Sequence, residues 1–350
     1  MYLDICVGNN PTAAATVTQV TRTPKTKYRP VAMDTVALEK LGVRKLRMTA
    51  RRVLAAAEKL YTQGYISYPR TETTIFPPDL QLDNLVQLQS ANQEWGPFAA
   101  DILQRGPATP RNGNKSDGAH PPLHPVKPAN KSAITNNDEW RVYELVVRHF
   151  LACCSRDARG HETKVYAKVN GEMFYTAGLA IEDRGYLLVY PYDRWTDKEI
   201  PNYREGNLIP KFEVKIRDGT TTAPPLLTEA DLIALMDRHG IGTDATHAEH
   251  IEKIQQRNYV AMTNDRRFRP TFMGMALVDG YNRMGQELLS RPELRSGLET
   301  QLLDIVEGRR TKEQVLQNQL QIYRQVFTIA ERNIENLTLS LNHFMRAMPN

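Results

Sequence analysis

The chain has 350 residues, of which 41% are hydrophobic, so it is long and apolar enough to fold into two or three domains rather than remain disordered. No apolar run approaches the roughly 20 residues of a membrane-spanning helix, and the three cysteines form no CxxC pair, which argues against a membrane protein, a disulfide framework and a structural zinc site. The formal net charge is +5, and cysteine usage makes a reducing compartment, cytosol or nucleus, the default expectation.

The first predicted element is a β-strand. Residues 1–16 carry little pattern and are set apart as an unmatched N-terminal remnant. The stretch "ATVTQVTRT" (residues 15–23) alternates β-branched and polar residues, as a strand does. Pro24 and Pro30 then bracket what we expect to be a basic loop.

A basic stretch follows this strand. Residues 22–52 contain ten lysines and arginines against two acidic residues. A concentration of this kind attracts phosphate backbones, although a solvated surface without a partner explains it equally well. Within the stretch, Arg44, Lys45 and Arg47 are candidate nucleic-acid-binding residues.

A helix is predicted next, from Ala50, with Thr49 as its N-cap. Apolar residues at helical spacing give it one buried face: Val53, Leu54, Ala57, Leu60 and Tyr61. Gly64 is placed to end the helix. The stretch "YISY" (residues 65–68) is then predicted to be a short strand, because Pro69 prevents a further helix.

The middle of the chain predicts one helix and a β-rich module. Residues 138–154 carry an apolar stripe at helical spacing. Residues 162–178 alternate around Asn170-Gly171, which is the strongest short hairpin signal, and "YLLVYPY" (residues 186–192) is expected to add a strand.

The last third predicts helices. Thr228 and Asp231 resemble a capping box in which Asp replaces the usual Glu or Gln, at the start of a helix that ends near Arg238. After a glycine-containing turn, a second helix is expected from about Ala245 to Arg257, which makes a helix-turn-helix-like unit. Residues 290–335 carry further amphipathic helices.

One tyrosine has a neighbour suited to phosphate chemistry. A guanidinium favours the phenolate form of a nearby tyrosine and grips a phosphate through two N–H groups. Tyr68 and Arg70 are two residues apart, and on an extended strand such residues share a face, so both can address one phosphate. A purely structural tyrosine remains the commoner reading of the tripeptide alone.

The loop predicted over residues 105–130 is crowded with Pro, Gly and Asn and contains "KSDGAHPP". His120 could donate to a phosphate oxygen or carry a proton, although a solvated loop histidine is the simpler alternative. Nearby Lys115, Ser116 and Asp117 are candidate nucleic-acid contacts. The GxxxxGK[ST] spacing is absent, so an ATP-binding loop is not predicted.

A third candidate is the turn "HGIGTDATHA" (residues 239–248). Its Gly242, Thr243 and Thr246 offer backbone N–H groups and hydroxyls to an anion at a helix N-terminus. An ordinary capped turn between two helices explains the same residues.

These three stretches together resemble the type IA DNA topoisomerases, and eukaryotic topoisomerase III of the alpha type in particular. The resemblance rests on "LYTQGYISYPRTET", "PRNGNKSDGAHPPLHP", "VRHFLACCS" and "LTEADLIALMDRHGIGTDATHAEHI", in this order, and spans roughly residues 16 to 335. It implies that Tyr68 attacks one DNA strand and holds its 5′-phosphate, that Arg70 positions that phosphate, and that His120 binds a phosphate near the break.

The resemblance also implies the architecture: a mixed α and β, multidomain toroid, with winged-helix-like gate and base domains joined by a β-rich arch. The gate with the catalytic tyrosine would be residues 32–160, and the base residues 223–335. The arch would be residues 17–31 and 161–222, and residues 336–350 a C-terminal tail.

The sequence departs from the family in two places. Nothing resembles the N-terminal TOPRIM domain, whose acidic residues bind Mg²⁺, and the C-terminal zinc modules are absent. A fragment, a truncated isoform or an incomplete gene model is therefore expected, with no metal ligands for Mg²⁺ in this chain. The alternative function is a single-stranded DNA-binding fragment that cannot cut. A tyrosine recombinase is disfavoured because Tyr68 lies early in the chain.

The resemblance implies further properties that the residues themselves do not encode. Rejoining would need no ATP. A RecQ-type helicase and an OB-fold accessory subunit are the expected protein partners, and single-stranded DNA is the expected ligand. The expected location is the nucleus, with a mitochondrial pool.

Overall fold

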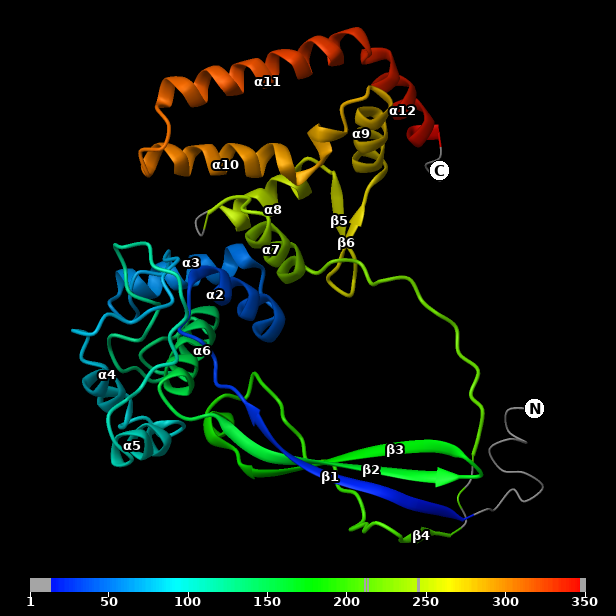
Figure 1. Cartoon of the computed structure of the whole chain (residues 1–350). Helices are drawn as coiled ribbons and strands as arrows, with labels where there is room; N and C mark the ends of the chain where they lie inside the picture. The colour runs from blue at the N-terminus through cyan, green and yellow to red at the C-terminus, as the bar shows by residue number, and fades with distance from the viewer. Residues whose placement is uncertain (1–13, 211, 213, 244–245, 347–350) are drawn as a thin grey trace.

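The computed structural model describes residues 14–210, 212, 214–243 and 246–346, and Figure 1 shows three parts. We call them the N-terminal helical cluster (residues 28–157), the sheet region (residues 14–27 and 158–209) and the C-terminal helical region (residues 228–346). Within the described residues, no helix is both long and apolar enough to span a lipid bilayer. The remnant proposed for residues 1–16 lies almost entirely outside the described residues.

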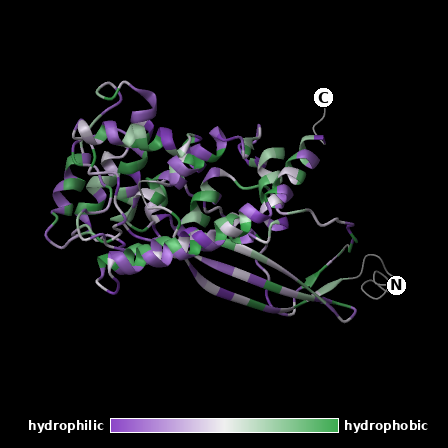
Figure 2. Ribbon diagram, turned by 90° about the horizontal axis from the view of Figure 1, so that it is seen from above, coloured by the Kyte–Doolittle hydropathy of each residue, from purple (hydrophilic) through white to green (hydrophobic). Residues whose placement is uncertain are grey.

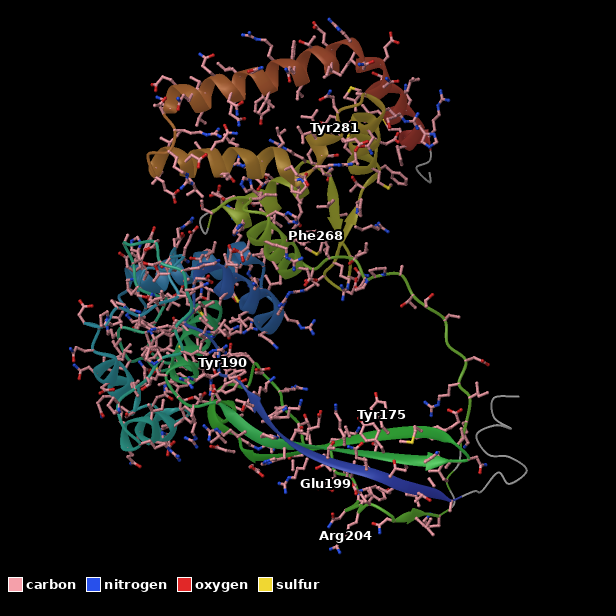
Figure 3. All side chains as sticks on the ribbon, in the orientation of Figure 1. Tyr175, Tyr190, Glu199, Arg204, Phe268 and Tyr281 are labelled. Atoms are coloured by element: carbon pink, nitrogen blue, oxygen red, sulfur yellow. The ribbon has the colours of Figure 1, made fainter. Side chains whose placement is uncertain are left out.

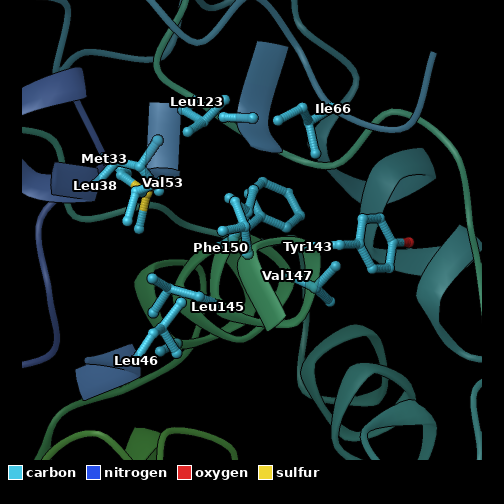
Figure 4. Packing of buried hydrophobic residues seen from close by; sticks show 14 of the residues in the cluster. Met33, Leu38, Leu46, Val53, Ile66, Leu123, Tyr143, Leu145, Val147 and Phe150 are labelled. Atoms are coloured by element: carbon cyan, nitrogen blue, oxygen red, sulfur yellow. The ribbon is translucent and has the colours of Figure 1, made fainter. Parts of the chain in front are cut away.

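The N-terminal helical cluster is built around one buried helix, α6 (Asn137–Cys153). In Figure 4 its side chains, among them Tyr143 and Phe150, lie between those of the surrounding elements. Thr49 caps α3 by accepting a hydrogen bond from the Arg52 N–H, as predicted. The surrounding helices are α2 (Thr35–Leu41), η1 (Gly42–Leu46), α3 (Ala50–Thr62), α4 (Leu82–Gln89) and α5 (Gly96–Gln104).

The sheet region is an antiparallel sheet with the strand order β3-β2-β1-β4. Its strands are β1 (Ala15–Lys27), β2 (Ala158–Val169), β3 (Glu172–Asp183) and β4 (Leu208–Ile209). The predicted β2–β3 hairpin is confirmed, and Asn170 and Gly171 both take positive φ, 46° and 95°. Figure 2 shows hydrophilic and apolar residues mixed along the long strands, because only one face of the sheet is buried.

The strand β1 is longer than predicted, because it continues through Pro24 to Lys27 where a loop was expected. Pro24 lies opposite His161 of β2, while β4 pairs only with Ala15 and Thr16. At Pro24 the strand is therefore at the edge of the sheet, where a missing N–H breaks no ladder bond. The expected start of the second arch segment, residue 161, falls inside β2.

Two predicted short strands are wrong. Residues 186–192 begin in a 3₁₀ turn, η2 (Gly185–Leu188), in which buried Tyr186 donates its hydroxyl to Asp193 Oδ2 over 2.6 Å. Residues 65–68 form only an isolated bridge, from Ile66 to Pro125. Short apolar runs do not distinguish a strand from other buried backbone, which explains both errors.

The C-terminal helical region starts with the predicted capping box, in which Thr228 and Asp231 bond reciprocally. Its elements are α7 (Glu229–Arg238), α8 (His247–Gln256), β5 (Val260–Met262), β6 (Phe268–Pro270), α9 (Phe272–Arg283), η3 (Glu287–Ser290), α10 (Pro292–Val306), α11 (Lys312–Arg332) and α12 (Ile334–Arg346). The predicted helix start at Ala245 lies outside the described residues. The C-terminal tail expected over residues 336–350 is corrected in its described part, because residues 336–346 belong to α12, which packs on α9.

The two helical parts meet where α2 packs on α7. The ion pairs that join the two parts include Arg44 to Asp231 at 3.0 Å and Lys115 to Asp237 at 3.3 Å, and Arg51 of α3 also pairs with Glu252 of α8. In Figure 1 the extended segment 214–227 runs separately from the sheet region to α7, so the three parts surround an open space.

Candidate active site

The segment around Tyr68 is fixed on both sides although it is not a strand. The Ser67 N–H donates to the His124 carbonyl over 2.9 Å, and the His124 N–H donates to Ser67 Oγ over 3.0 Å. On the other side, the Thr71 N–H donates to Oγ1 of fully buried Thr35 over 2.7 Å. These bonds, rather than the ladder of a strand, hold the backbone of Tyr68 and Arg70 in a defined conformation.

The ring of Tyr68 contacts two other rings. The imidazole of His120 lies 4.8 Å away between centroids and is tilted by 37°. Tyr61, near the end of α3, meets Tyr68 edge-on at 5.2 Å and 69°. The structure therefore brings together Tyr68 and His120, which lie 52 positions apart in the sequence.

Arg70 is held by an acidic residue that the sequence analysis missed. Glu58 Oε1 accepts hydrogen bonds from Arg70 Nε over 2.8 Å and from Nη2 over 2.6 Å. The Arg70 side chain is about one quarter exposed, at 27%. Glu58 precedes Tyr61 by three residues, so both project from one face of α3. This spacing is the sequence feature that could have indicated Glu58 as a neighbour of the site.

The loop that carries His120 is organised by Asp117. One oxygen of its carboxylate accepts from the N–H groups of Ala119 and His120, both at 2.8 Å, and the other accepts from the Thr71 hydroxyl at 3.2 Å. Burial alone would raise the pKa of Asp117, but these hydrogen bonds outweigh it and lower the pKa below its usual range. The ionised Asp117 also lies 3.4 Å from Nδ1 of His120, which orients the ring.

The other loop candidates serve the fold. Lys115 Nζ pairs with Asp237 of α7 at 3.3 Å, so it joins the two helical parts. The Ser116 hydroxyl accepts the Gly118 N–H over 3.2 Å within the loop. Their contact with DNA stays a prediction.

The turn before α8 is tightly built. Gly242 has φ +78°, and a Cβ there would lie 2.7 Å from Oγ1 of Thr246. The Thr243 N–H donates to that same oxygen over 2.9 Å. The sequence thus correctly identified a turn at a helix N-terminus, and its role in binding an anion stays a prediction.

The basic candidates divide between a cavity and a helix end. Arg44 and Lys45 line a cavity of about 490 Å³ together with Asp34 and Asp237. Burial raises the pKa of Asp34. Arg47 instead follows η1 with φ 54°.

The comparisons with known proteins agree on one family. Residues 6–317 match the family described as DNA topoisomerase. Over 334 residues the chain is 53% identical to DNA topoisomerase 3 of Caenorhabditis elegans, covering 95% of this chain and 44% of that protein. Over 333 residues it is 55% identical to DNA topoisomerase 3-alpha of Homo sapiens, covering 94% of this chain and 33% of that protein. The chain thus spans less than half the length of these relatives.

The fold also matches a solved structure, full-length topoisomerase I from Thermotoga maritima. The TM-score is 0.74 at 22% sequence identity, and the match covers 90% of this chain and 52% of that chain. This similarity establishes the mixed α and β fold.

Proposed function

This chain belongs to the type IA DNA topoisomerases and is similar to topoisomerase III, and we propose that Tyr68 is the nucleophile that opens one DNA strand. The observation that supports this most is the contact of Tyr68 with His120, at 4.8 Å between rings, beside an arginine on the same fixed segment.

The proposed reaction is a transesterification. The Tyr68 hydroxyl gives its proton to solvent, its oxygen forms a bond to the scissile phosphorus as the bond to the 3′ oxygen breaks, and the 3′ oxygen takes a proton from solvent and leaves as a hydroxyl. One phosphodiester replaces another, so the 3′-hydroxyl can reverse the step without ATP. Arg70 would hold the phosphate through its N–H groups, and His120 would donate to a phosphate oxygen as negative charge develops.

The fold suggests how a second strand would pass. In our proposal the three parts form a toroid, with the N-terminal helical cluster as a winged-helix-like gate, the sheet region as an arch and the C-terminal helical region, α12 included, as a base. The gate would lift from the base at the α2–α7 contact. The extended segment 214–227, which reaches α7 separately from the gate, supports this proposal.

The residues that the structure describes do not fit a Mg²⁺ site. Among the residues that the structure describes, no three His, Cys, Asp or Glu side chains gather closely enough to hold a metal ion. We therefore derive no step through Mg²⁺. The second candidate function is binding of single-stranded DNA without cutting it.

The protein partners remain part of the proposal. A RecQ-type helicase and an OB-fold accessory subunit would act with this chain, in the nucleus and in a mitochondrial pool. Affinity capture from nuclear and mitochondrial extracts, with identification by mass spectrometry, tests both statements.

A relaxation assay separates the two candidate functions. Negatively supercoiled DNA is incubated with Mg²⁺ and either this chain or its Tyr68→Phe variant, and covalent protein–DNA adducts are trapped with detergent. Relaxation and adducts that disappear in Tyr68→Phe are the expected result and exclude the binding-only candidate. If neither variant relaxes DNA or forms an adduct, while both bind single-stranded DNA, the binding-only candidate is correct.

A further inference from the structure

The outer face of the sheet region carries two tyrosines that the proposed chemistry does not use. Tyr166 of β2 and Tyr175 of β3 lie directly opposite each other in the strand register. Their rings are 6.1 Å apart between centroids and tilted by 34°. Tyr175 is 74% exposed, the highest value among the exposed tyrosines of the described residues.

These rings are not needed for the core of the sheet. Alternate residues of β2 point to the opposite face, where Val165, Ala167 and Val169 are buried. That opposite face is closed by Phe212, which packs edge-on against Phe174 at 5.2 Å. Tyr166 and Tyr175 therefore occupy the solvated face, where polar residues are the usual choice.

The polar residues around the two rings suit a phosphate backbone. Lys168 lies opposite Met173, two pairs along the strands from the tyrosines and therefore on the same face, and Lys164 lies two pairs along in the other direction. Lys25 and Lys164 share a single acidic partner, Glu162, at 3.5 Å and 3.6 Å. Positive charge on this face thus exceeds negative charge. The β1 residues that complete the face are Thr16, Gln19, Thr21 and Thr23.

We propose that this face, defined by Tyr166, Tyr175, Lys164 and Lys168, binds single-stranded nucleic acid by stacking bases on the two rings. Exposed aromatic side chains flanked by lysines match unpaired bases and their phosphates together. A duplex offers the same phosphates and hides the faces of its bases, so stacking selects a single strand.

The position of this face adds a second contact for nucleic acid to the proposed function. This inference rests on the proposed function only for the kind of ligand. In Figure 3 Tyr175 lies on the side of the sheet that faces the C-terminal helical region, whereas Arg204 lies beyond the other side. The face therefore borders the open space of Figure 1, at a distance from the N-terminal helical cluster, which contains Tyr68. A strand held there would be separate from the strand that Tyr68 attacks.

Crosslinking tests the location. The chain is mixed with a short oligothymidylate in which some thymines are replaced by 5-iodouracil, and the mixture is irradiated with long-wave ultraviolet light. Crosslinked peptides are identified by mass spectrometry. Crosslinks at Tyr166 or Tyr175, retained in Tyr68→Phe, are expected. Crosslinks that map only to other parts of the chain would overturn the proposal.

Binding measurements test the stacking. By fluorescence anisotropy with labelled oligothymidylate, Tyr166→Ala and Tyr175→Ala should each weaken binding about tenfold. The matched control is Tyr323→Ala, which removes a ring that is 46% exposed on α11 and should leave affinity unchanged. Equal weakening for a hairpin duplex of the same length would contradict stacking, and unchanged affinity of both variants would contradict the site.

These outcomes are distinguishable from failure of the proposed function. Tyr175→Ala is on the surface, and an unchanged thermal transition by circular dichroism verifies its fold. A chain that forms no adduct and still loses affinity in Tyr175→Ala supports the sheet site and refutes cleavage. A chain that forms the adduct and keeps its affinity in Tyr175→Ala refutes the sheet site and leaves the proposed cleavage standing.

Discussion

Single residues decide whether the Tyr68 segment can act on a phosphate. Arg70 is oriented by Glu58 through two hydrogen bonds to one oxygen, so its guanidinium is held before any DNA arrives. Holding a long side chain in advance saves the entropy that it would otherwise lose on binding. Asp117 does the same for His120, by accepting its backbone N–H and lying near its ring.

Arg70→Ala should impair cleavage more than binding. Loss of one donor that stabilises developing charge lowers a rate by about 100-fold or more, whereas one phosphate contact among many changes affinity little. The measurements are the rate of adduct formation and the anisotropy of a bound oligonucleotide. Arg52→Ala is the control, because Arg52 pairs with Asp138 at 2.6 Å at the other end of α3. Loss of folding by circular dichroism in Arg70→Ala would mean that Arg70 is structural.

Helices and strands differ in how far the sequence predicted them. The cap at Thr49 and the hairpin at Asn170-Gly171 were predictable because each depends on the residue types at a few adjacent positions and on the backbone conformation that these residues favour. The strand expected at residues 186–192 failed because burial there comes from tertiary packing of Tyr186. At the candidate site, the sequence predicted Tyr68, Arg70 and His120 through their resemblance to a family; the structure places the rings of Tyr68 and His120 in contact, and the catalytic roles stay predictions. The sequence could not identify Glu58, whose role depends on how α3 lies beside the Tyr68 segment.

The start of α7 makes a pH-dependent contact with the start of α3. Buried Glu229 accepts the Ala50 N–H over 3.0 Å, and burial raises the pKa of Glu229. Because the pKa of Glu229 is higher in the folded state, its carboxyl group ionises at a lower pH in the unfolded chain. Folding stability therefore falls as pH rises from the unfolded pKa through the folded pKa.

Glu229→Gln should therefore stabilise the protein relative to wild type near pH 7 and do so less near pH 4. The amide oxygen still accepts the Ala50 N–H and carries no buried charge, and the gain should be about 1 kcal/mol. Urea denaturation across this pH range measures it. Glu287→Gln, at an exposed ion pair with Arg291, is the control and should change little. A larger benefit at low pH would contradict the assignment.

At the scale of the whole molecule, basic side chains of the N-terminal helical cluster lie where it meets the C-terminal helical region. Lys40, Arg44 and Lys45 line the cavity beside the α2–α7 contact. Arg44 is already paired with Asp231, so Lys45 is the better candidate for a phosphate contact.

Single-stranded DNA binding should fall steeply with salt, and Lys45→Ala should reduce the slope of log affinity against log salt by about 0.7. Anisotropy titrations at several salt concentrations give this slope. Lys312→Ala, at the first position of α11, is the control and should leave it unchanged. A flat salt response of the wild-type chain would refute a role for the basic stretch as a whole.

The extended segment 214–227 has a mechanical consequence. It contains fourteen residues in which the structure assigns no helix or strand, so it resists stretching only through its contour length. Fully extended, such a segment reaches about 46 to 50 Å. Segment 214–227 therefore limits the separation of the sheet region from α7 only at about this length. The resistance to any opening motion comes from the noncovalent α2–α7 contact. A force applied across the molecule would be borne first by that contact and only at much larger extension by the covalent chain.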